Sequence, residues 1–217
     1  PRGEDGTVQS LFEMMNIPYV GCSVTSSALC MDKVFTKVIL RQNDLPIVDY
    51  KVIYKQELLI RMSEILLELE NSLGYPCFIK PANLGSSVGI SKAKNREELK
   101  SALLMAAEYD IKVLIEKFVD AREIECSVLG NDKPRASLPG EIIPSREFYD
   151  YTAKYLDGDK SKLLLPAPIS RKDVERIQEL AIKTFTALDC SGMARVDFLM
   201  SKITGNIYIN ELNTIPG

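Results

Sequence analysis

The sequence predicts an α+β or α/β fold in which helices cover one face of each sheet. Three observations predict it. The composition is that of an ordinary globular protein, with 46% hydrophobic and 26% charged residues. Segments with helical spacing alternate with β-rich segments, and the last two strand patterns are consistent with an antiparallel hairpin. The 217 residues allow one large domain or two small ones, with an expected division near Asp120.

Two helices are predicted near the start of the chain. Thr7 begins the first, because its hydroxyl can cap a helix and apolar residues follow at helical spacing. Pro18 ends this helix. Residues 25–42 predict a single second helix, which ends before the turn formed by residues 43–46.

The next segment predicts a strand, a helix and a second strand. Ile47 to Tyr54 is rich in β-formers. Glu57 to Ser72 has apolar side chains at helical spacing, with Leu59 expected on the face that packs against the core. Cys77 to Lys80 predicts a buried strand, and the Gly/Ser-rich segment Pro81 to Gly89 predicts a loop.

The second half of the chain predicts a helix, three strands, a loop, a long helix and a hairpin. The first helix covers Arg96 to Tyr109. The three strands are expected at Lys112–Val119, Glu123–Leu129 and Arg135–Ile143, followed by a loop at Tyr149–Leu165. Ser170 caps the long helix, which covers Arg171 to Leu188. Met193–Met200 and Asn206–Asn213 form the hairpin.

The chain contains no histidine. This absence excludes a Ser-His-Asp triad, a Cys-His dyad and a His-ligated zinc site within the chain. The net charge of −3 predicts no general affinity for nucleic acid or anionic membranes. Five scattered cysteines without a CxxC pair predict reduced, buried thiols in a cytoplasmic protein, and no apolar run is long enough to span a membrane.

Four polar residues of the expected hairpin could form a metal site. Arg195 and Asp197 share one face of the first strand, and Glu211 and Asn213 share one face of the second. If the two faces coincide, two carboxylates and an amide oxygen would offer ligands for Mg²⁺ that also holds phosphate, beside a guanidinium that could stabilise an oxyanion. The alternative is a solvated face with an Arg–Asp pair. The second strand, ending in Asn-Glu-Leu-Asn, favours the metal site.

The loop after the strand at Cys77 predicts a phosphate-binding site. It offers backbone N–H groups, the hydroxyls of Ser86 and Ser87, and Lys80 on the preceding strand, where apolar neighbours imply an anionic partner. The loop has neither the Walker order nor the GxGxxG order of glycines. A simple turn is the alternative.

Three further segments leave two interpretations open. Lys33 is expected to be a solvated surface charge, whereas Lys37 could be that or a ligand. The segment Glu116 to Val119 could present backbone groups to an adenine or could be an exposed strand end. The segment Phe148 to Tyr155, with three tyrosines and Lys154, could be a functional loop or could pack on the core.

Seven motifs together resemble those of the D-alanine–D-alanine ligases of the ATP-grasp superfamily. They are G-E-D-G-T-V-Q from Gly3, I-P-Y-V-G from Ile17, M-D-K from Met31, K-P-A-N-L-G-S-S-V-G from Lys80, F-Y-D-Y-T-A-K-Y from Phe148, A-R-V-D-F from Ala194 and N-E-L-N-T-I-P-G from Asn210. Their common order and compatible spacing make the set far more specific than any one motif.

The resemblance implies an ATP-grasp fold, which is an α+β fold with two subdomains that hold ATP between them. Residues 1–30 would end an N-terminal domain and form a linker, 31–120 would form the central subdomain, and 121–217 an incomplete C-terminal subdomain. The enzyme would join two D-alanines for peptidoglycan precursor synthesis. ATP would phosphorylate one carboxylate, the second amine would attack the acylphosphate through a tetrahedral intermediate, and phosphate would leave. A homodimer is possible by the same resemblance.

The resemblance also implies roles for individual residues. The ATP phosphates would be held by Lys37, Lys80 and Lys154 and covered by Ser86 and Ser87. The adenine would contact Glu116, Lys117, Phe118 and Val119. The ribose would bind Glu123. Two Mg²⁺ ions, or Mn²⁺, would be bound by Asp197, Glu211 and Asn213. Arg195 and the backbone N–H of Gly217 would form the oxyanion hole, while Tyr155 and Ser86 would orient the reacting groups.

The chain also departs from the family pattern. An N-terminal domain with a glutamate for the first D-alanine, and a segment that helps bind the second, are not in the sequence. The chain alone is therefore expected to bind ATP and Mg²⁺ without making dipeptide. Ser10 stands where the family usually has glycine. Three alternatives stay open: a D-alanine–D-serine ligase, another carboxylate–amine ligase, and a non-catalytic ATP-grasp nucleotide-binding module. Relatives that accept D-lactate typically use a histidine in the tyrosine-rich loop, so Tyr155 favours an amine nucleophile.

Overall fold

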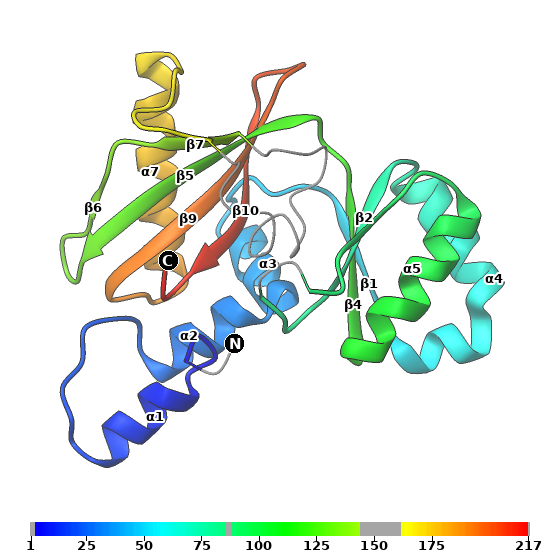
Figure 1. The fold of residues 1–217 in the computed structure, drawn as a ribbon, viewed down its shortest axis with the longest axis horizontal. Coiled ribbons are helices and arrows are strands. Elements are labelled where there is room, and N and C mark those ends of the chain that lie inside the picture. The colour runs from blue at the N-terminus through cyan, green and yellow to red at the C-terminus, as the bar shows by residue number, and fades with distance from the viewer. Residues whose placement is uncertain (1–2, 86–87, 144–161, 217) are drawn as a thin grey trace. The chain divides into compact units, whose positions relative to one another are not determined.

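The computed structural model describes residues 3–85, 88–143 and 162–216 (Figure 1). The chain divides into two compact units. Of the described residues, the larger unit contains 3–47, 120–143 and 162–216, and the smaller unit contains 48–85 and 88–119. Among the described residues, no helix is both long enough and apolar enough to cross a membrane.

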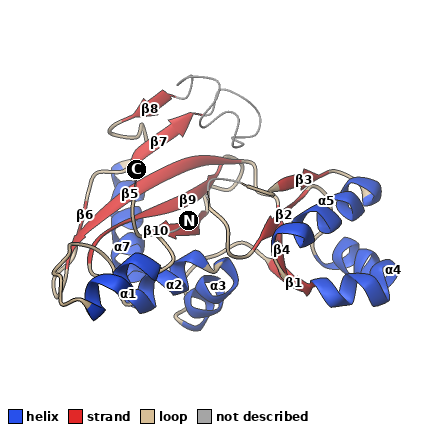
Figure 2. Cartoon of the chain, turned by 60° about the horizontal axis from the view of Figure 1, so that its bottom comes forward, coloured by secondary structure: helices blue, strands red, loops and turns tan. Residues whose placement is uncertain are grey.

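The smaller unit is a four-stranded sheet covered on one face by two helices (Figure 2). Its elements are β1 (Tyr50–Tyr54), α4 (Lys55–Ser72), β2 (Cys77–Pro81), β3 (Ser91–Ala93), α5 (Arg96–Tyr109) and β4 (Lys112–Lys117). The strand order is β1-β4-β2-β3, and all neighbours are antiparallel. Ile79 and Ile115 of the sheet pack against Leu99 and Leu103 of α5, and all four side chains are fully buried. Because strand residues alternate between faces, Phe78, Lys80, Lys92 and Glu116 belong to the opposite face.

The larger unit contains a second antiparallel sheet, with α7 packed on one face (Figure 2). Its elements are α1 (Thr7–Met14), α2 (Val24–Met31), α3 (Lys33–Gln42), β5 (Ala121–Gly130), β6 (Arg135–Ala136), β7 (Gly140–Ile143), β8 (Lys162–Leu164), α7 (Arg171–Ala187), β9 (Gly192–Ser201) and β10 (Ile207–Asn213). The strand order is β10-β9-β5-β7-β8, and β6 pairs with β5. The two antiparallel sheets confirm the α+β class.

The core of the larger unit lies between α7 and its sheet. Ile177 and Phe185 of α7 pack in one cluster with Ile124 of β5 and with Val196 and Phe198 of β9, and all five are at most 1% exposed. All five cysteines of the chain are buried and free in the structure.

The helix expected over residues 25–42 is wrong as a single element. Asp32 separates α2 from α3, because its extended backbone ends the first helix and its carboxylate caps the second. The side-chain oxygen accepts hydrogen bonds from the N–H groups of Val34 at 3.0 Å and Phe35 at 3.2 Å. The sequence signal was present, since aspartate is a preferred N-cap residue.

Other differences from the expected elements have local causes. The strand expected at 135–143 is two strands, β6 and β7, with Pro139 between them, which cannot donate to a sheet ladder. Leu59 is 79% exposed and Leu58 is buried instead, because Leu58 is in helical phase with the buried Ile65 and Leu69, whereas Leu59 lies at the edge of that face. Strands β3 and β8 have three residues each, too few to show a periodic pattern.

Replacing the Asp32 cap should weaken the larger unit. The Asp32→Ala variant is expected to lower the free energy of unfolding by about 1 kcal/mol, because two N–H groups at the start of α3 lose their acceptor. Urea denaturation measures the change. The control is Glu108→Ala on the exposed side of α5, for which we expect a change below about 0.5 kcal/mol. Equal effects of the two substitutions would contradict the capping role.

Candidate functional site

The hairpin of β9 and β10 places four predicted site residues on the face of the sheet opposite α7, which we call the open face. Its register pairs Glu211 with Asp197 and Asn213 with Arg195. Val196 and Leu212 lie between them in sequence and are buried in the core. Arg195, Asp197, Glu211 and Asn213 therefore lie on the same face of the sheet, as the hypothesis of a metal site required.

A register shift in β10 creates this coincidence. The pairing with β9 is irregular between Ile209 and Glu211, so Asn210 is the extra residue of a β-bulge. Ile209 and Leu212 are three positions apart, yet both are buried in the core. In a regular strand they would lie on opposite faces, so the bulge is what turns Glu211 to the open face.

Arg195 and Asp197 form a paired contact on this face. The Arg195 Nε donates to Asp197 Oδ1 at 2.7 Å, and Nη2 donates to Oδ2 at 2.9 Å. Asn213 Nδ2 also donates to Asp197 Oδ2, at 2.9 Å. Two parallel bonds between a guanidinium and a carboxylate are strong and fix the orientation of both groups.

Strand β5 adds two glutamates to the open face. Glu123 and Glu125 alternate with the buried Ile124 and Cys126, so both side chains face away from α7. Glu125 is the register partner of Asp197, and its Oε1 lies 3.3 Å from Arg195 Nη2. Glu123 was predicted, but Glu125 was missed. Alternation places Glu125 on the same face of β5 as Glu123, but only the pairing of β5 with β9 places it beside Asp197.

The charges on the open face shift one another's ionisation. Burial is the main cause that raises the pKa of Asp197 to about 7; Arg195 lowers this pKa, whereas Glu211 and Glu125 raise it further. The pKa of the Arg195 guanidinium is raised, first by Asp197 and then by Glu125 and Glu211. Arg195 is therefore always a cation here, and the carboxylates crowded around it attract further positive charge.

The open face fits a divalent metal that is shared with phosphate. Among the described residues, no three histidine, cysteine, aspartate or glutamate side chains form a group that could hold a metal ion. Mg²⁺ does not require one, because it is usually bound by one or two carboxylates together with phosphate oxygens and water. Asp197 and Glu211 are direct register partners, and Asn213 next to them adds an amide oxygen.

In the smaller unit, Lys80 has the anionic partner that the sequence implied. Its Nζ lies 2.5 Å from Glu116 Oε2, and the Glu116 side chain is only 3% exposed. Lys80 also lies 5.9 Å from the ring centre of Phe78, and Phe78 packs against Phe118 at 6.0 Å between ring centres. Lys92 lies over the Phe118 ring at 4.0 Å. These side chains form a surface of aromatic rings and cations, which suits a nucleotide.

The segment 116–119 combines buried and exposed groups. Glu116 is buried, Lys117 is exposed, and Phe118 and Val119 are half-buried. The N–H groups of Lys117 and Phe118 donate to the carbonyls of Asp49 and Pro76, at 2.9 and 3.3 Å. These two N–H groups therefore already donate to acceptors within the protein.

Lys37 of α3 is 1% exposed, which excludes the solvated alternative for this residue. A buried ammonium group is costly unless anions or dipoles compensate it, so it is a common feature of sites that bind anions.

A family model described as "D-ala D-ala ligase C-terminus" matches residues 39–217. The chain belongs to the D-alanine–D-alanine ligase family. The matched region includes the open-face residues and the Lys80–Glu116 pair.

Curated members of this family are similar to the chain over all of its 217 residues. The D-alanine–D-alanine ligase of Thermoanaerobacter sp. (strain X514) is 60% identical over 217 residues. The one from Ruminiclostridium cellulolyticum is 53% identical over the same length. The chain spans about 60% of the length of the first relative and 58% of the second.

Solved structures of family members confirm the ATP-grasp fold. The VanG D-Ala:D-Ser ligase from Enterococcus faecalis matches with a TM-score of 0.88 and 40% identity, over 100% of this chain and 61% of that one. The D-alanine–D-alanine ligase from Coxiella burnetii matches with a TM-score of 0.83 and 38% identity, over 100% of this chain and 56% of that one.

Several residues expected from the ligase family lie outside the described residues. They are Ser86, Ser87, Lys154, Tyr155 and Gly217. Their expected roles remain predictions.

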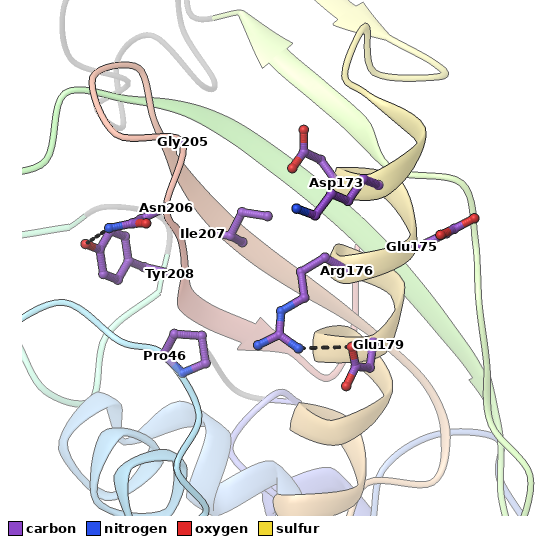
Figure 3. A pocket seen from close by; sticks show the side chains of 10 residues that line it. Pro46, Asp173, Glu175, Arg176, Glu179, Gly205, Asn206, Ile207 and Tyr208 are labelled. Atoms are coloured by element: carbon purple, nitrogen blue, oxygen red, sulfur yellow. Dashed lines mark hydrogen bonds and ion pairs between the residues drawn. The ribbon is translucent and has the colours of Figure 1, made fainter.

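A separate pocket of the larger unit contains none of the predicted ligase residues (Figure 3). It is lined by side chains of α7, the start of β10 and Pro46. Its charged groups partly neutralise each other, since Arg176 Nη1 lies 2.9 Å from Glu179 Oε2, as the dashed line in Figure 3 marks. This pocket lacks the convergent charge of the open face.

The Lys80–Glu116 pair yields a prediction about stability. The Glu116→Leu variant is expected to lower the free energy of unfolding by about 3–5 kcal/mol, because it leaves a largely buried ammonium without its carboxylate. Replacing both residues, with Lys80→Met and Glu116→Leu, should recover most of that loss. Urea denaturation of both variants provides the measurement. A double variant no more stable than the single one would show that the pair is not the source of the effect.

Proposed function

We propose that the chain supplies the ATP- and metal-binding part of a ligase that joins two D-alanines for peptidoglycan precursor synthesis. The observation that carries the proposal is the open face, where Arg195, two carboxylates and Asn213 lie together. Such a set provides what phosphoryl transfer to a carboxylate requires, namely hard oxygen ligands and a fixed cation. Membership of the ligase family gives that chemistry its substrates.

In the proposed reaction, a carboxylate oxygen of the first D-alanine attacks the γ-phosphorus of ATP, which gives an acylphosphate and ADP. The amine of the second D-alanine then attacks the acyl carbon and loses a proton. The resulting tetrahedral intermediate expels inorganic phosphate and leaves the peptide bond. Bound Mg²⁺, or Mn²⁺, would neutralise charge on the phosphates.

Residues of the chain have distinct tasks in this proposal. Asp197, Glu211 and Asn213 hold the metal, while Lys37 and Lys80 bind the phosphates together with Lys154, Ser86 and Ser87. The adenine binds against Glu116, Lys117, Phe118 and Val119, and Glu123 holds the ribose. Arg195 stabilises the oxyanion of the tetrahedral intermediate with the N–H of Gly217, while Tyr155 and Ser86 orient the reacting groups. The supports are the open face and the Lys80–Glu116 pair.

A D-alanine–D-serine ligase is the second candidate. The similarity to the VanG D-Ala:D-Ser ligase, at 40% identity and a TM-score of 0.88, favours it. A non-catalytic nucleotide-binding module is less consistent with Arg195, because binding ATP alone does not require a cation held where an oxyanion would form.

A hybrid enzyme tests these candidates. The chain replaces the matched region of the Thermoanaerobacter relative, and dipeptide formation from D-alanine, D-serine and ATP is measured beside the unaltered relative. We expect ATP-dependent D-alanyl-D-alanine. Preferential incorporation of D-serine would favour the second candidate, and ATP binding without dipeptide would favour the non-catalytic module.

We also propose a cytoplasmic location and a homodimer. Free thiols at all five cysteines support the first, because disulfides form in oxidising compartments. Exposed apolar side chains on α1 and the loop after it, among them Leu11, Met14, Met15 and Val20, support the second. Sedimentation equilibrium should show a dimer that Leu11→Lys dissociates. A monomer at all concentrations would contradict the dimer.

A further inference from the structure

Three carboxylates form a row across the open face of the larger unit. Glu125 of β5 and Glu211 of β10 are both register partners of Asp197 on the central strand β9. Side chains of register partners lie about 4.5–5.5 Å apart at Cβ, and like charges there repel each other. The row therefore needs a cation even before any ligand binds.

Arg195 is that cation, and it contacts two members of the row. Its two bonds to Asp197 are 2.7 and 2.9 Å, and its Nη2 lies 3.3 Å from Glu125 Oε1. The Arg195 side chain is only 20% exposed. A guanidinium so placed is costly if it loses its carboxylates.

A metal at Asp197 would compete with these contacts for the lone pairs of the carboxylate. Arg195 takes one bond to each of its two oxygens, and Asn213 adds another to Oδ2. These three bonds occupy three of the roughly four lone-pair sites of the carboxylate, so a metal bound by both oxygens would displace a bond to Oδ2, from Arg195 or from Asn213. Glu125 is the neighbouring carboxylate that can then hold the guanidinium on the same face.

We infer that Glu125 is a positioning residue for Arg195, which it retains on the open face when Asp197 turns to a metal. This inference rests on the proposed function, because it requires a metal at Asp197. Glu125 thereby lowers the cost of releasing Asp197, and it keeps the guanidinium beside the place where the oxyanion would form.

The experiment measures Mn²⁺ affinity of the chain in the presence of ATP, by the electron paramagnetic resonance signal of free Mn²⁺. A double-mutant cycle combines Glu125→Gln with Arg195→Gln. Glu179→Gln is the matched control, because it also removes a carboxylate that pairs with an arginine, but from α7. Glu125→Asp tests whether the charge at this position is sufficient. Thermal unfolding of every variant checks that the fold is retained.

We expect Glu125→Gln to weaken Mn²⁺ binding about tenfold when Arg195 is present, and less than about threefold when Arg195→Gln is also present. Glu125→Asp and the control should stay within about threefold of the unsubstituted chain. Equal losses from Glu125→Gln in both backgrounds would overturn the inference, because Glu125 would then act by its own charge. If the unsubstituted chain binds no Mn²⁺, both the proposed function and the inference fail. If it binds Mn²⁺ but the losses are equal in both backgrounds, only the inference about Glu125 fails.

Discussion

The Asp197→Asn variant is expected to bind Mn²⁺ in the presence of ATP more than about 100-fold less tightly than the unsubstituted chain. The substitution removes one of the two carboxylates that are register partners on the open face and leaves Glu211. Loss of an outer-shell partner already costs roughly 10–100-fold in metal affinity, so loss of a direct ligand should cost more. Titration with Mn²⁺, with the free ion followed by electron paramagnetic resonance, measures the difference.

The matched control for this variant is Asp120→Asn. Asp120 pairs with Lys202 at 2.8 Å and is half exposed, so its loss should leave the Mn²⁺ affinity unchanged within about twofold. If Asp197→Asn bound Mn²⁺ as tightly as this control, Asp197 would not be a metal ligand.

The Arg195→Gln variant is expected to have the largest effect on turnover. In the hybrid with the Thermoanaerobacter relative, the kcat for dipeptide formation should fall by about 10²–10³, since one oxyanion donor is removed. The KM for ATP should change little, because the guanidinium acts on the tetrahedral intermediate. Steady-state kinetics with D-alanine and ATP separates the two parameters.

Lysine should not restore the lost activity. The Arg195→Lys variant keeps the charge but lacks the planar fork that makes two bonds to Asp197. We expect its kcat to stay at least about tenfold below that of the unsubstituted hybrid. Full activity in either Arg195 variant would remove this residue from the catalytic machinery.

Strong local patterns allowed much of the fold to be predicted. The helix over 171–188 has long, regular apolar spacing, and the final hairpin has two β-rich segments joined by a short connection. The structure contains them as α7 and β9–β10. The two helices separated by Asp32 were merged, because the residues on both sides continue in helical spacing while a single cap interrupts them. A helix break at a single capping residue hardly changes the spacing of apolar residues, so periodicity alone does not predict it.

In the candidate site, too, features within one strand could be predicted, whereas the pairing between distant strands could not. Alternation along β9 was enough to place Arg195 and Asp197 on one face. Which residues of β5 lie beside them depends on the register between strands that are far apart in the sequence. Glu125 and Asp197, for example, are 72 residues apart, and no local pattern encodes that register. Glu125 was therefore missed, and the bulge at Asn210 became visible only in the pairing of β10 with β9.

In the proposed function, the open face of β5, β9 and β10 binds the metal together with ATP. The most direct test is a map of the paramagnetic broadening that Mn²⁺ causes in the backbone amide resonances of the chain with ATP bound. We expect amides near Glu125, Asp197 and Glu211 to broaden first, and Asp197→Asn to abolish this effect. Broadening that instead begins at the pocket around Arg176 and Tyr208, and persists in the variant, would contradict it.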